Sequence, residues 1–321
     1  MNSYAKTFGF VSVMLLVLFV AMSSVYAADA TQPLVSTQWV ADNMKSIKII
    51  DVSKKEYAEG HIPGAVQIKW GSEVFGPETD HMVLGLSEIE RVMGKMGVTP
   101  DDHIVLYDGF NKPHAHYVSR VYWTLKYWKF PKVSVMDGGI IAWKKEGRPI
   151  TTEATKPSRT NAEVSFPPNT KIRAMYSPDI IHALATGESV ILDARNAAFF
   201  NGEVYSLNKW VRSGHVTGAK NVFTLDNMNS DNTYKPVADI KARYEKAGIT
   251  ADKSIITYCD TGVLASHAWF VLHELLGYEK VKVYDGSMRE YANMFDTPMV
   301  PGVVGGQFPK TPIQELQEKV K

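Results

Sequence analysis

The chain has 321 residues, of which 45% are hydrophobic, 21% charged and 11% aromatic, and its formal net charge is +1 at pH 7. This length and composition predict two globular domains of ordinary size and exclude a largely disordered chain. No run of basic residues is longer than two, which argues against a surface that binds nucleic acid through its phosphates.

Residues 1–27 have the pattern of a secretory signal peptide. Lys6 precedes an apolar stretch over residues 8–20, and the small side chains of Val25 and Ala27 stand three residues and one residue before the expected cleavage point. The apolar stretch has thirteen residues, fewer than the ~20 that a membrane-spanning helix needs. We therefore expect an exported protein, periplasmic or extracellular in a bacterium, with no stable membrane insertion.

The rest of the chain contains two copies of one pattern. Four landmarks recur in the same order: Asp51 and Asp193 at the ends of apolar runs, His61 and His215 in Gly-His segments, the runs 104–107 and 255–258, and Asp137 and Asp285. The three pairs of single residues are offset by 142, 154 and 148 positions. Nearly constant offsets are typical of a duplicated domain.

In each copy, short runs rich in β-branched residues alternate with segments of helical period. Strands are predicted over residues 47–51, 104–107 and 133–136 in the first copy, and over 190–193, 255–258 and 281–284 in the second. Helices are predicted over residues 36–44, 86–96 and 115–128, then over 177–185, 239–247 and 263–276. This alternation predicts an α/β fold with two domains, each a mostly parallel sheet flanked by helices on both faces.

The domain boundaries follow from composition. We expect the first domain over residues 28–155 and the second over 173–300. Between them, residues 156–172 contain three prolines among serine, threonine and asparagine, which is typical of a linker. Residues 301–321 begin with glycines and form a C-terminal tail.

Cys259, the single cysteine, stands where a predicted strand ends and a helix begins. It is followed by Asp260, Thr261 and Gly262, and the helix starts at about Val263. Sites in open α/β sheets form outside the carboxyl ends of the strands. Loop N–H groups and the helix dipole would stabilise a thiolate there, so we expect a lowered pKa for the thiol. The position favours a reactive thiol over a buried, inert one.

Spacing disfavours several other chemistries for these residues. A cysteine phosphatase needs an arginine six residues after the cysteine, where this chain has Ala265. His267 and His273 lie on the helix that leads away from the loop, which is atypical of a papain-like pair, and no Cys-x-x-Cys motif suggests a thioredoxin-like oxidoreductase. His114 and His116 have no cysteine or acidic cluster beside them, so no metal site is predicted.

Residues 35–300 resemble the tandem-domain rhodanese family of thiosulfate and 3-mercaptopyruvate sulfurtransferases. Three segments carry the resemblance: Gly60-His61-Ile62-Pro63-Gly64-Ala65, Cys259-Asp260-Thr261-Gly262-Val263-Leu264-Ala265-Ser266 and Tyr284-Asp285-Gly286-Ser287. The resemblance implies a catalytic second domain and a structural first domain. Asp108 occupies the cysteine position of the first copy, where it cannot carry sulfur. The Gly-His segments are structural in both copies by the same resemblance.

The resemblance also implies a mechanism. The Cys259 thiolate would take the outer sulfur of a small donor such as thiosulfate, mercaptopyruvate or polysulfide, and the loop N–H groups from Asp260 to Ala265 would hold the persulfide. Cyanide, sulfite, a thiol or a redox protein would then accept the sulfur, giving ping-pong kinetics. No cofactor or metal is implied.

Two departures from the family bear on the substrate. Family members carry arginines where this chain has Phe199 and Asn201, and thiosulfate enzymes have basic residues where it has Asp260 and Thr261. An aspartate beside the thiolate should repel anionic donors. Other cations would then have to bind the donor, and the candidates are Arg195, Lys112, Arg212 and Arg289, although Arg195 resembles a structural partner of Asp193.

The departures leave a second hypothesis open. A rhodanese-fold module without catalytic turnover would bind sulfur or another chalcogen and deliver it to one protein partner.

Overall fold

The computed structural model describes residues 31–76, 81–204 and 211–302. The strands and helices described below belong to one compact unit that begins at Pro33. The predicted signal peptide and residues 303–321 of the predicted tail lie outside the described residues, so export stays a prediction. Within the described part of the chain, every helix is too short or too polar to span a bilayer.

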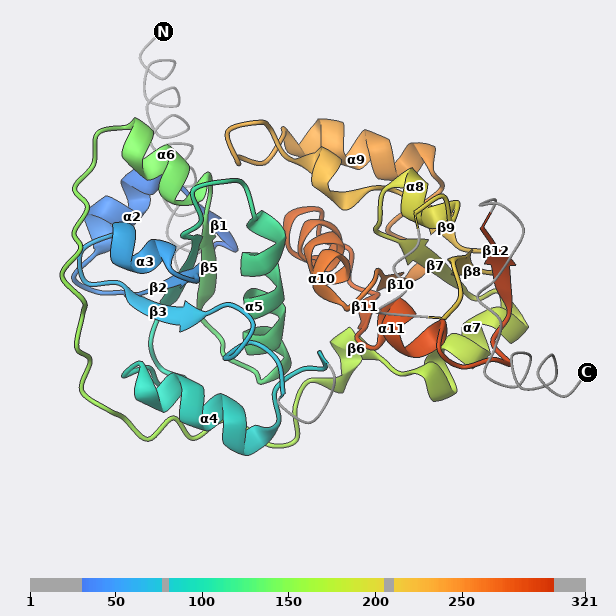
Figure 1. Cartoon of the computed structure of the whole chain (residues 1–321), viewed down its shortest axis with the longest axis horizontal. Helices are drawn as coiled ribbons and strands as arrows, with labels where there is room; N and C mark the ends of the chain where they lie inside the picture. The colour runs from blue at the N-terminus through green and yellow to red at the C-terminus, as the bar shows by residue number, and fades with distance from the viewer. Residues whose placement is uncertain (1–30, 77–80, 205–210, 303–321) are drawn as a thin grey trace, which may run out of the picture. The chain divides into compact units, whose positions relative to one another are not determined.

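The core consists of two five-stranded parallel sheets with the same strand order (Figure 1). The first sheet has the order β1-β5-β4-β2-β3 and is made of β1 (Leu34–Val35), β2 (Lys48–Ser53), β3 (Val66–Lys69), β4 (Ile104–Asp108) and β5 (Val133–Met136). The second has the order β6-β11-β10-β7-β9 and is made of β6 (Arg173–Ala174), β7 (Ser189–Asp193), β9 (Lys220–Asn221), β10 (Ser254–Tyr258) and β11 (Val281–Tyr284). The repeated order confirms the predicted pair of α/β domains. The strands β8 (Gly214–Val216) and β12 (Met299–Pro301) form a separate antiparallel pair.

The helices connect the parallel strands, as right-handed α/β crossovers require. In the first domain they are α2 (Thr37–Asn43), α3 (Glu56–Glu59), α4 (Leu86–Lys95), α5 (Ala115–Tyr127) and α6 (Gly139–Lys145). The second domain begins with a short η1 (Thr170–Ile172), and its other helices are η2 (Tyr176–Ile180), α7 (Ile181–Thr186), α8 (Ala197–Phe200), η3 (Thr224–Asn227), α9 (Val237–Lys246), α10 (Val263–Trp269), η4 (Phe270–Leu275) and α11 (Ser287–Tyr291). The helix η2 continues directly into α7, and α10 continues directly into η4. The predicted helices are present within a few residues. The sequence missed α3, α6, α8 and α11, because elements of four to seven residues are too short to show a helical period.

The segment predicted as a linker, 156–172, runs along the first domain. The Thr160 N–H donates to the carbonyl of Gly94 at 3.0 Å, the Asn169 N–H donates to Tyr127 O at 2.7 Å, and Ala162 is buried. A Cβ at Gly94 would lie 2.6 Å from Thr160 O, so the helix α4 needs a glycine where the segment crosses it. The segment is therefore held against the first domain and is not a flexible linker.

The two domains pack through the helices that follow their equivalent central strands. Figure 1 shows α5 and α10 side by side, and the ring of Tyr122 meets that of Phe270 edge to face at 4.9 Å. Beside this contact, Arg120 Nη1 on α5 lies 2.6 Å from Asp285 Oδ1, just after β11. Both side chains are buried. Asp285 Oδ2 also accepts the N–H of Val83 at 2.9 Å, so this carboxylate joins three elements from the two domains.

Replacing Arg120 by alanine should lower the free energy of unfolding by about 3 kcal/mol, because Asp285 would stay buried with only the more distant Arg173, at 3.4 Å, as its counter-charge. Urea denaturation checks this. Lys241→Ala is the matched control, since it breaks the exposed Lys241–Glu245 pair and should change stability little. Equal losses in the two variants would contradict the importance of the interdomain pair.

Candidate active site

The loop after β10 is closed tightly around the cysteine. Cys259 is 1% exposed, and Gly262 adopts a φ of 78° at the start of α10. A Cβ at Gly262 would lie 2.7 Å from Arg120 Nη1 and 2.9 Å from Asp285 O. Both the left-handed backbone and the lack of space require glycine here. The interdomain ion pair thus lies directly against the cysteine loop.

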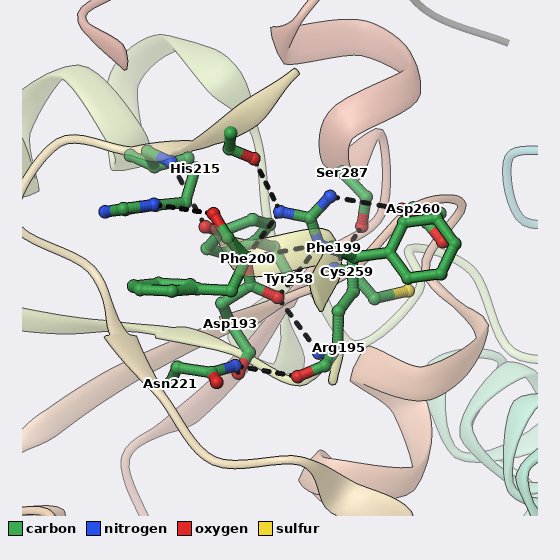
Figure 2. Close-up of polar contacts among 12 residues, drawn as sticks. Asp193, Arg195, Phe199, Phe200, His215, Asn221, Tyr258, Cys259, Asp260 and Ser287 are labelled. Atoms are coloured by element: carbon green, nitrogen blue, oxygen red, sulfur yellow. Dashed lines mark hydrogen bonds and ion pairs between the residues drawn. The ribbon is translucent and has the colours of Figure 1, made fainter. Parts of the chain in front are cut away.

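A second loop, after β11, holds the backbone of the first. The Cys259 N–H donates to Ser287 Oγ at 3.1 Å, and Ser287 Oγ donates to Tyr284 O at 2.8 Å. The N–H groups of Met288 and Arg289 donate to the carbonyls of Cys259 and Asp260, each at 2.9 Å. Figure 2 shows Ser287 directly beside Cys259. These bonds hold the backbone of the cysteine loop in place.

Ser287 adopts a backbone conformation that glycine would accept more easily. Its φ is 50°, and the equivalent residue of the first domain is Gly139, with a φ of 54°. A left-handed conformation costs a residue with a side chain about 1–2 kcal/mol. The serine therefore carries strain that its hydroxyl offsets by accepting the Cys259 N–H.

The first domain repeats the cysteine loop with a carboxylate in place of the thiol. Asp108 accepts the N–H of Phe110, two residues on, and that of His114, six residues on. In the second domain, the N–H groups of Thr261 and Ala265, at the same offsets, act on the Cys259 thiol and lower its pKa. Both loops therefore direct the same two donors at the side chain that ends the central strand. An anion already occupies this arrangement in the first domain whenever Asp108 is ionised.

The expectation of an acidified thiol is wrong. Burial raises the pKa of Cys259 above its ordinary value, and the neighbouring Asp260 raises it further, while the N–H groups of Ala265 and Thr261 lower it only in part. The same opposition acts on Asp108, where burial raises the pKa to about 7 against the lowering by the N–H groups of His114 and Phe110. The expectation from the sequence considered the N–H donors of the loop but not the loss of hydration of the buried thiol, which disfavours the thiolate.

Arg195 is not free to bind a donor. Its guanidinium contacts Asp193 Oδ2 at 2.7 Å and Gly214 O at 2.8 Å, and it reaches Asp260 Oδ1 at 3.3 Å (Figure 2). The side chain is 2% exposed. Arg195 therefore orients Asp260 beside the thiol, a positioning role that the sequence indicated through Asp193.

Arg212 and Lys112 do not face the cysteine either. The Arg212 guanidinium donates to the carbonyls of Tyr291, Ala292, Met294 and Thr297, so it fixes the segment after α11. Lys112 is exposed on the loop after β4, in the first domain. Neither residue lines the cavity described below. The interpretation of these two cations as donor-binding groups is corrected on that ground.

The histidines of the Gly-His segments have matching structural partners. The ring of His61 stacks on Tyr57, and the ring of His215 stacks on Phe200, each with centroids 3.6 Å apart. In each copy Nδ1 lies within 2.8 Å of the carbonyl of the residue under the ring. The geometry agrees with the structural role expected for both.

The other histidines do not form a catalytic pair with the thiol or a metal cluster. His267 Nδ1 lies 2.7 Å from Thr224 Oγ1, and its ring stacks on Tyr234. Burial lowers the pKa of both His267 and His116 to about 3, so both are neutral at physiological pH. Among the described residues, no group of three or more His, Cys, Asp or Glu side chains is arranged to hold a metal ion.

Cys259 lines a cavity of about 860 Å³ between the two domains. The second domain contributes Cys259, Asp260, Thr261, Val263, Leu264 and Arg289. The first domain contributes Lys54, Trp70, Gly71, Ser72, Phe75, Gly76, His81, His116 and Tyr117. Of the predicted loop residues, Gly262 and Ala265 lie behind this surface, and the others line it. Sequence reasoning missed the whole first-domain wall, because no local pattern links it to a cysteine about 140 to 200 positions away.

Comparisons with known proteins find the same domain family in both halves of the chain. The model of the rhodanese-like domain matches residues 36–146 and again 177–294. "Sulfur carrier protein TtuD" of Thermus thermophilus is 35% identical over 281 residues, covering 84% of this chain and 96% of that protein. A Mycolicibacterium smegmatis protein named "Putative thiosulfate sulfurtransferase" is 33% identical over 278 residues, covering 84% and 98%.

Solved structures share the fold at lower identity. EanB in complex with ergothioneine matches with a TM-score of 0.76 and 23% identity, over 85% of this chain and 71% of that one. The anaerobic ergothioneine biosynthesis enzyme from Chlorobium limicola, in complex with trimethyl histidine, matches with a TM-score of 0.75 and 24% identity, over 84% and 70%. At this identity the likeness shows the fold alone.

Two variants separate the strain at Ser287 from its hydrogen bond. Ser287→Ala keeps the side chain at positive φ and loses the acceptor for the Cys259 N–H, so it should destabilise the protein by about 1–3 kcal/mol. Ser287→Gly loses the same acceptor but relieves the backbone, so it should be the more stable of the two by about 1 kcal/mol. Urea unfolding of both variants measures the difference. A glycine variant less stable than the alanine variant would show that the backbone is not strained.

Asp260→Asn should lower the pKa of Cys259, because it removes the negative charge that ranks second to burial in raising it. Iodoacetamide is a neutral reagent that reacts with the thiolate. The rate of alkylation should then begin to increase at a lower pH than in the unchanged protein. Asp101→Asn, an exposed acid ahead of β4, is the matched control and should leave the pH profile in place. A profile that stays or moves to higher pH in Asp260→Asn would refute the assignment.

Proposed function

Because this chain belongs to the tandem rhodanese family, we propose that it moves sulfane sulfur from a donor to a thiophilic acceptor through a persulfide on Cys259. The proposal is a sulfurtransferase activity without a resident cofactor. The two mutually equivalent loops, one with a cysteine and one with an aspartate, supply the main argument.

The observation that carries the proposal is the pair of N–H groups aimed at the end of each central strand. In the first domain they bond to the carboxylate of Asp108, so the loop accommodates a side chain that is longer than cysteine and ends in an anion. A persulfide on Cys259 has the same character, with one atom more than the thiol and a negative terminal sulfur. The donors at Thr261 and Ala265 would stabilise that terminal sulfur as they stabilise a carboxylate oxygen.

The chemistry needs two steps. The Cys259 thiolate attacks the outer sulfur of a donor such as thiosulfate; a sulfur–sulfur bond forms to Cys259, the donor's own sulfur–sulfur bond breaks, and sulfite leaves with the electron pair. An acceptor such as cyanide then takes the terminal sulfur, which gives thiocyanate and restores the thiolate. A covalent intermediate of this kind implies ping-pong kinetics.

A second candidate is a sulfur carrier that serves one protein partner and turns over small acceptors slowly. Asp260 favours it, because this carboxylate stands beside the thiol and raises its pKa, which lowers the fraction of reactive thiolate and slows turnover. A relative named as a sulfur carrier protein supports the same reading. The two candidates share the persulfide and differ in the acceptor.

The persulfide itself is testable by intact-protein mass. Incubation of the full chain with thiosulfate, mercaptopyruvate or polysulfide should add one sulfur atom with at least one donor, and added cyanide should remove it as thiocyanate. Cys259→Ser, the matched control, should gain nothing, because a hydroxyl forms no persulfide.

Two results distinguish the candidates. Fast removal by cyanide supports a general sulfurtransferase, whereas a stable persulfide with slow release to cyanide supports the carrier. Failure of all three donors to load Cys259, or equal loading of Cys259→Ser, would overturn both.

A further inference from the structure

The cavity in front of Cys259 is much larger than the standard donors need. Its volume of about 860 Å³ lies in the range of sites that hold drug-sized organic ligands. Thiosulfate has only a few atoms and would touch one side of it, as would the acceptors sulfite and cyanide. A small anion beside the thiol would leave most of the first-domain wall without a contact.

The opposite wall is aromatic and comes from the first domain. The rings of Trp70 and Tyr117 stack with centroids 3.8 Å apart and an interplanar angle of 14°. Phe75 meets Trp70 edge to face at 5.4 Å. All three line the cavity and are only partly buried, although each packs against the core. Large aromatic side chains left half open around a cavity are typical of sites for ring-containing ligands.

The wall is held in place by the interdomain ion pair. Arg120 Nη2 donates to the carbonyl of His81 at 3.1 Å, and the Arg120 guanidinium lies 5.3 Å from the centroid of Phe75. His81 packs on Phe75 and has a φ of 73°, a left-handed conformation that is strained for a side chain. The residue that anchors the cysteine loop therefore also orders the aromatic wall, which places the two surfaces in fixed register.

The charged side chains that line the cavity determine which sign of charge a ligand can carry. Among the described residues, Lys54 and Arg289 bring positive charge to the cavity and Asp260 brings negative charge. His116 is neutral, since burial lowers its pKa to about 3. The balance favours an anionic group and disfavours a cation against the aromatic faces, even though such faces attract cations in other settings.

We propose that the donor which loads Cys259 is an organic sulfur compound with a flat, unsaturated ring and an anionic group. The ring lies against Trp70 and Tyr117, the anionic group lies toward Lys54 and Arg289, and the transferable sulfur meets the thiol. This inference rests on the proposed function and names its substrate class.

Thiosulfonate anions test the ring with the chemistry held constant. Each has the form R–SO₂–S⁻; attack by the Cys259 thiolate breaks its sulfur–sulfur bond, gives the persulfide and releases the sulfinate R–SO₂⁻. Charge and atoms balance without any co-reactant. Benzenethiosulfonate carries a ring, methanethiosulfonate carries a methyl group, and thiosulfate carries neither.

The full chain should load from benzenethiosulfonate with a kcat/KM about ten to a hundred times that from methanethiosulfonate, as expected when a ring is buried and stacked. Trp70→Ala should reduce that ratio to a few-fold, and Trp70→Phe should restore much of it. Because both donors are compared on the same variant, any loss of folded protein cancels in the ratio. Phe166→Ala removes an aromatic ring that is 75% exposed outside the cavity and should leave the ratio unchanged.

Failure of this inference is distinct from failure of the proposed function. If both thiosulfonates load Cys259 at similar rates, or if Trp70→Ala keeps the full preference for the ring, the ring-binding wall is wrong and the persulfide chemistry stands. If no probe loads Cys259 and polysulfide also fails, the proposed function itself is overturned.

Discussion

The buried ion pair between Arg120 and Asp285 is the contact on which the site depends. It joins α5 of one domain to the loop after β11 of the other, at 2.6 Å and out of reach of water. A buried pair of this kind contributes little net stability over an apolar contact, but it is costly to break and it tolerates little misalignment. Its geometry fixes three things at once: the space that only Gly262 fits, the carbonyl of His81, and the relative position of the loop and the wall. The cysteine has a cavity only because the domains are docked in this register.

Duplication explains why the two loops can be compared residue by residue. Both copies keep the strand order, the stacked histidine and the pair of N–H donors after the central strand. They differ where chemistry would be placed: Asp108 against Cys259, and Gly139 against Ser287. The first copy fills its loop with the side chain of Asp108 and has glycine at the left-handed position. The second has a cysteine in its loop and a strained serine that holds the cysteine backbone, so these differences between the copies are concentrated at the site.

The thiol lies under two opposing influences. Burial and Asp260 favour the neutral form, whereas the N–H groups of Ala265 and Thr261 favour the anion. The Arg195 guanidinium lies 3.3 Å from Asp260 and also donates to Asp193 and Gly214. It therefore compensates the negative charge of Asp260 only in part. A thiol with a raised pKa is protected from adventitious oxidation, since the thiolate is the reactive form. On the proposed function, the donor would then have to supply its own binding energy, and the large cavity in front of Cys259 is suited to provide it.

The sequence by itself determined the duplication, the central strands, most of the longer helices and the place of Cys259 at a strand end. These features are local: periodicity and β-branched runs reflect burial along one segment, and equal spacing of landmarks exposes the repeat. Only the tertiary structure decided what surrounds the thiol. Arg120 and Asp285 lie 165 positions apart, Trp70 and Tyr117 belong to the other domain, and Arg195 and Arg212 turn out to be occupied by carboxylates and carbonyls. The tertiary structure also decided the direction in which the pKa of Cys259 shifts. Desolvation of the sulfur depends on all the atoms that exclude water from it and not only on its neighbours in the chain.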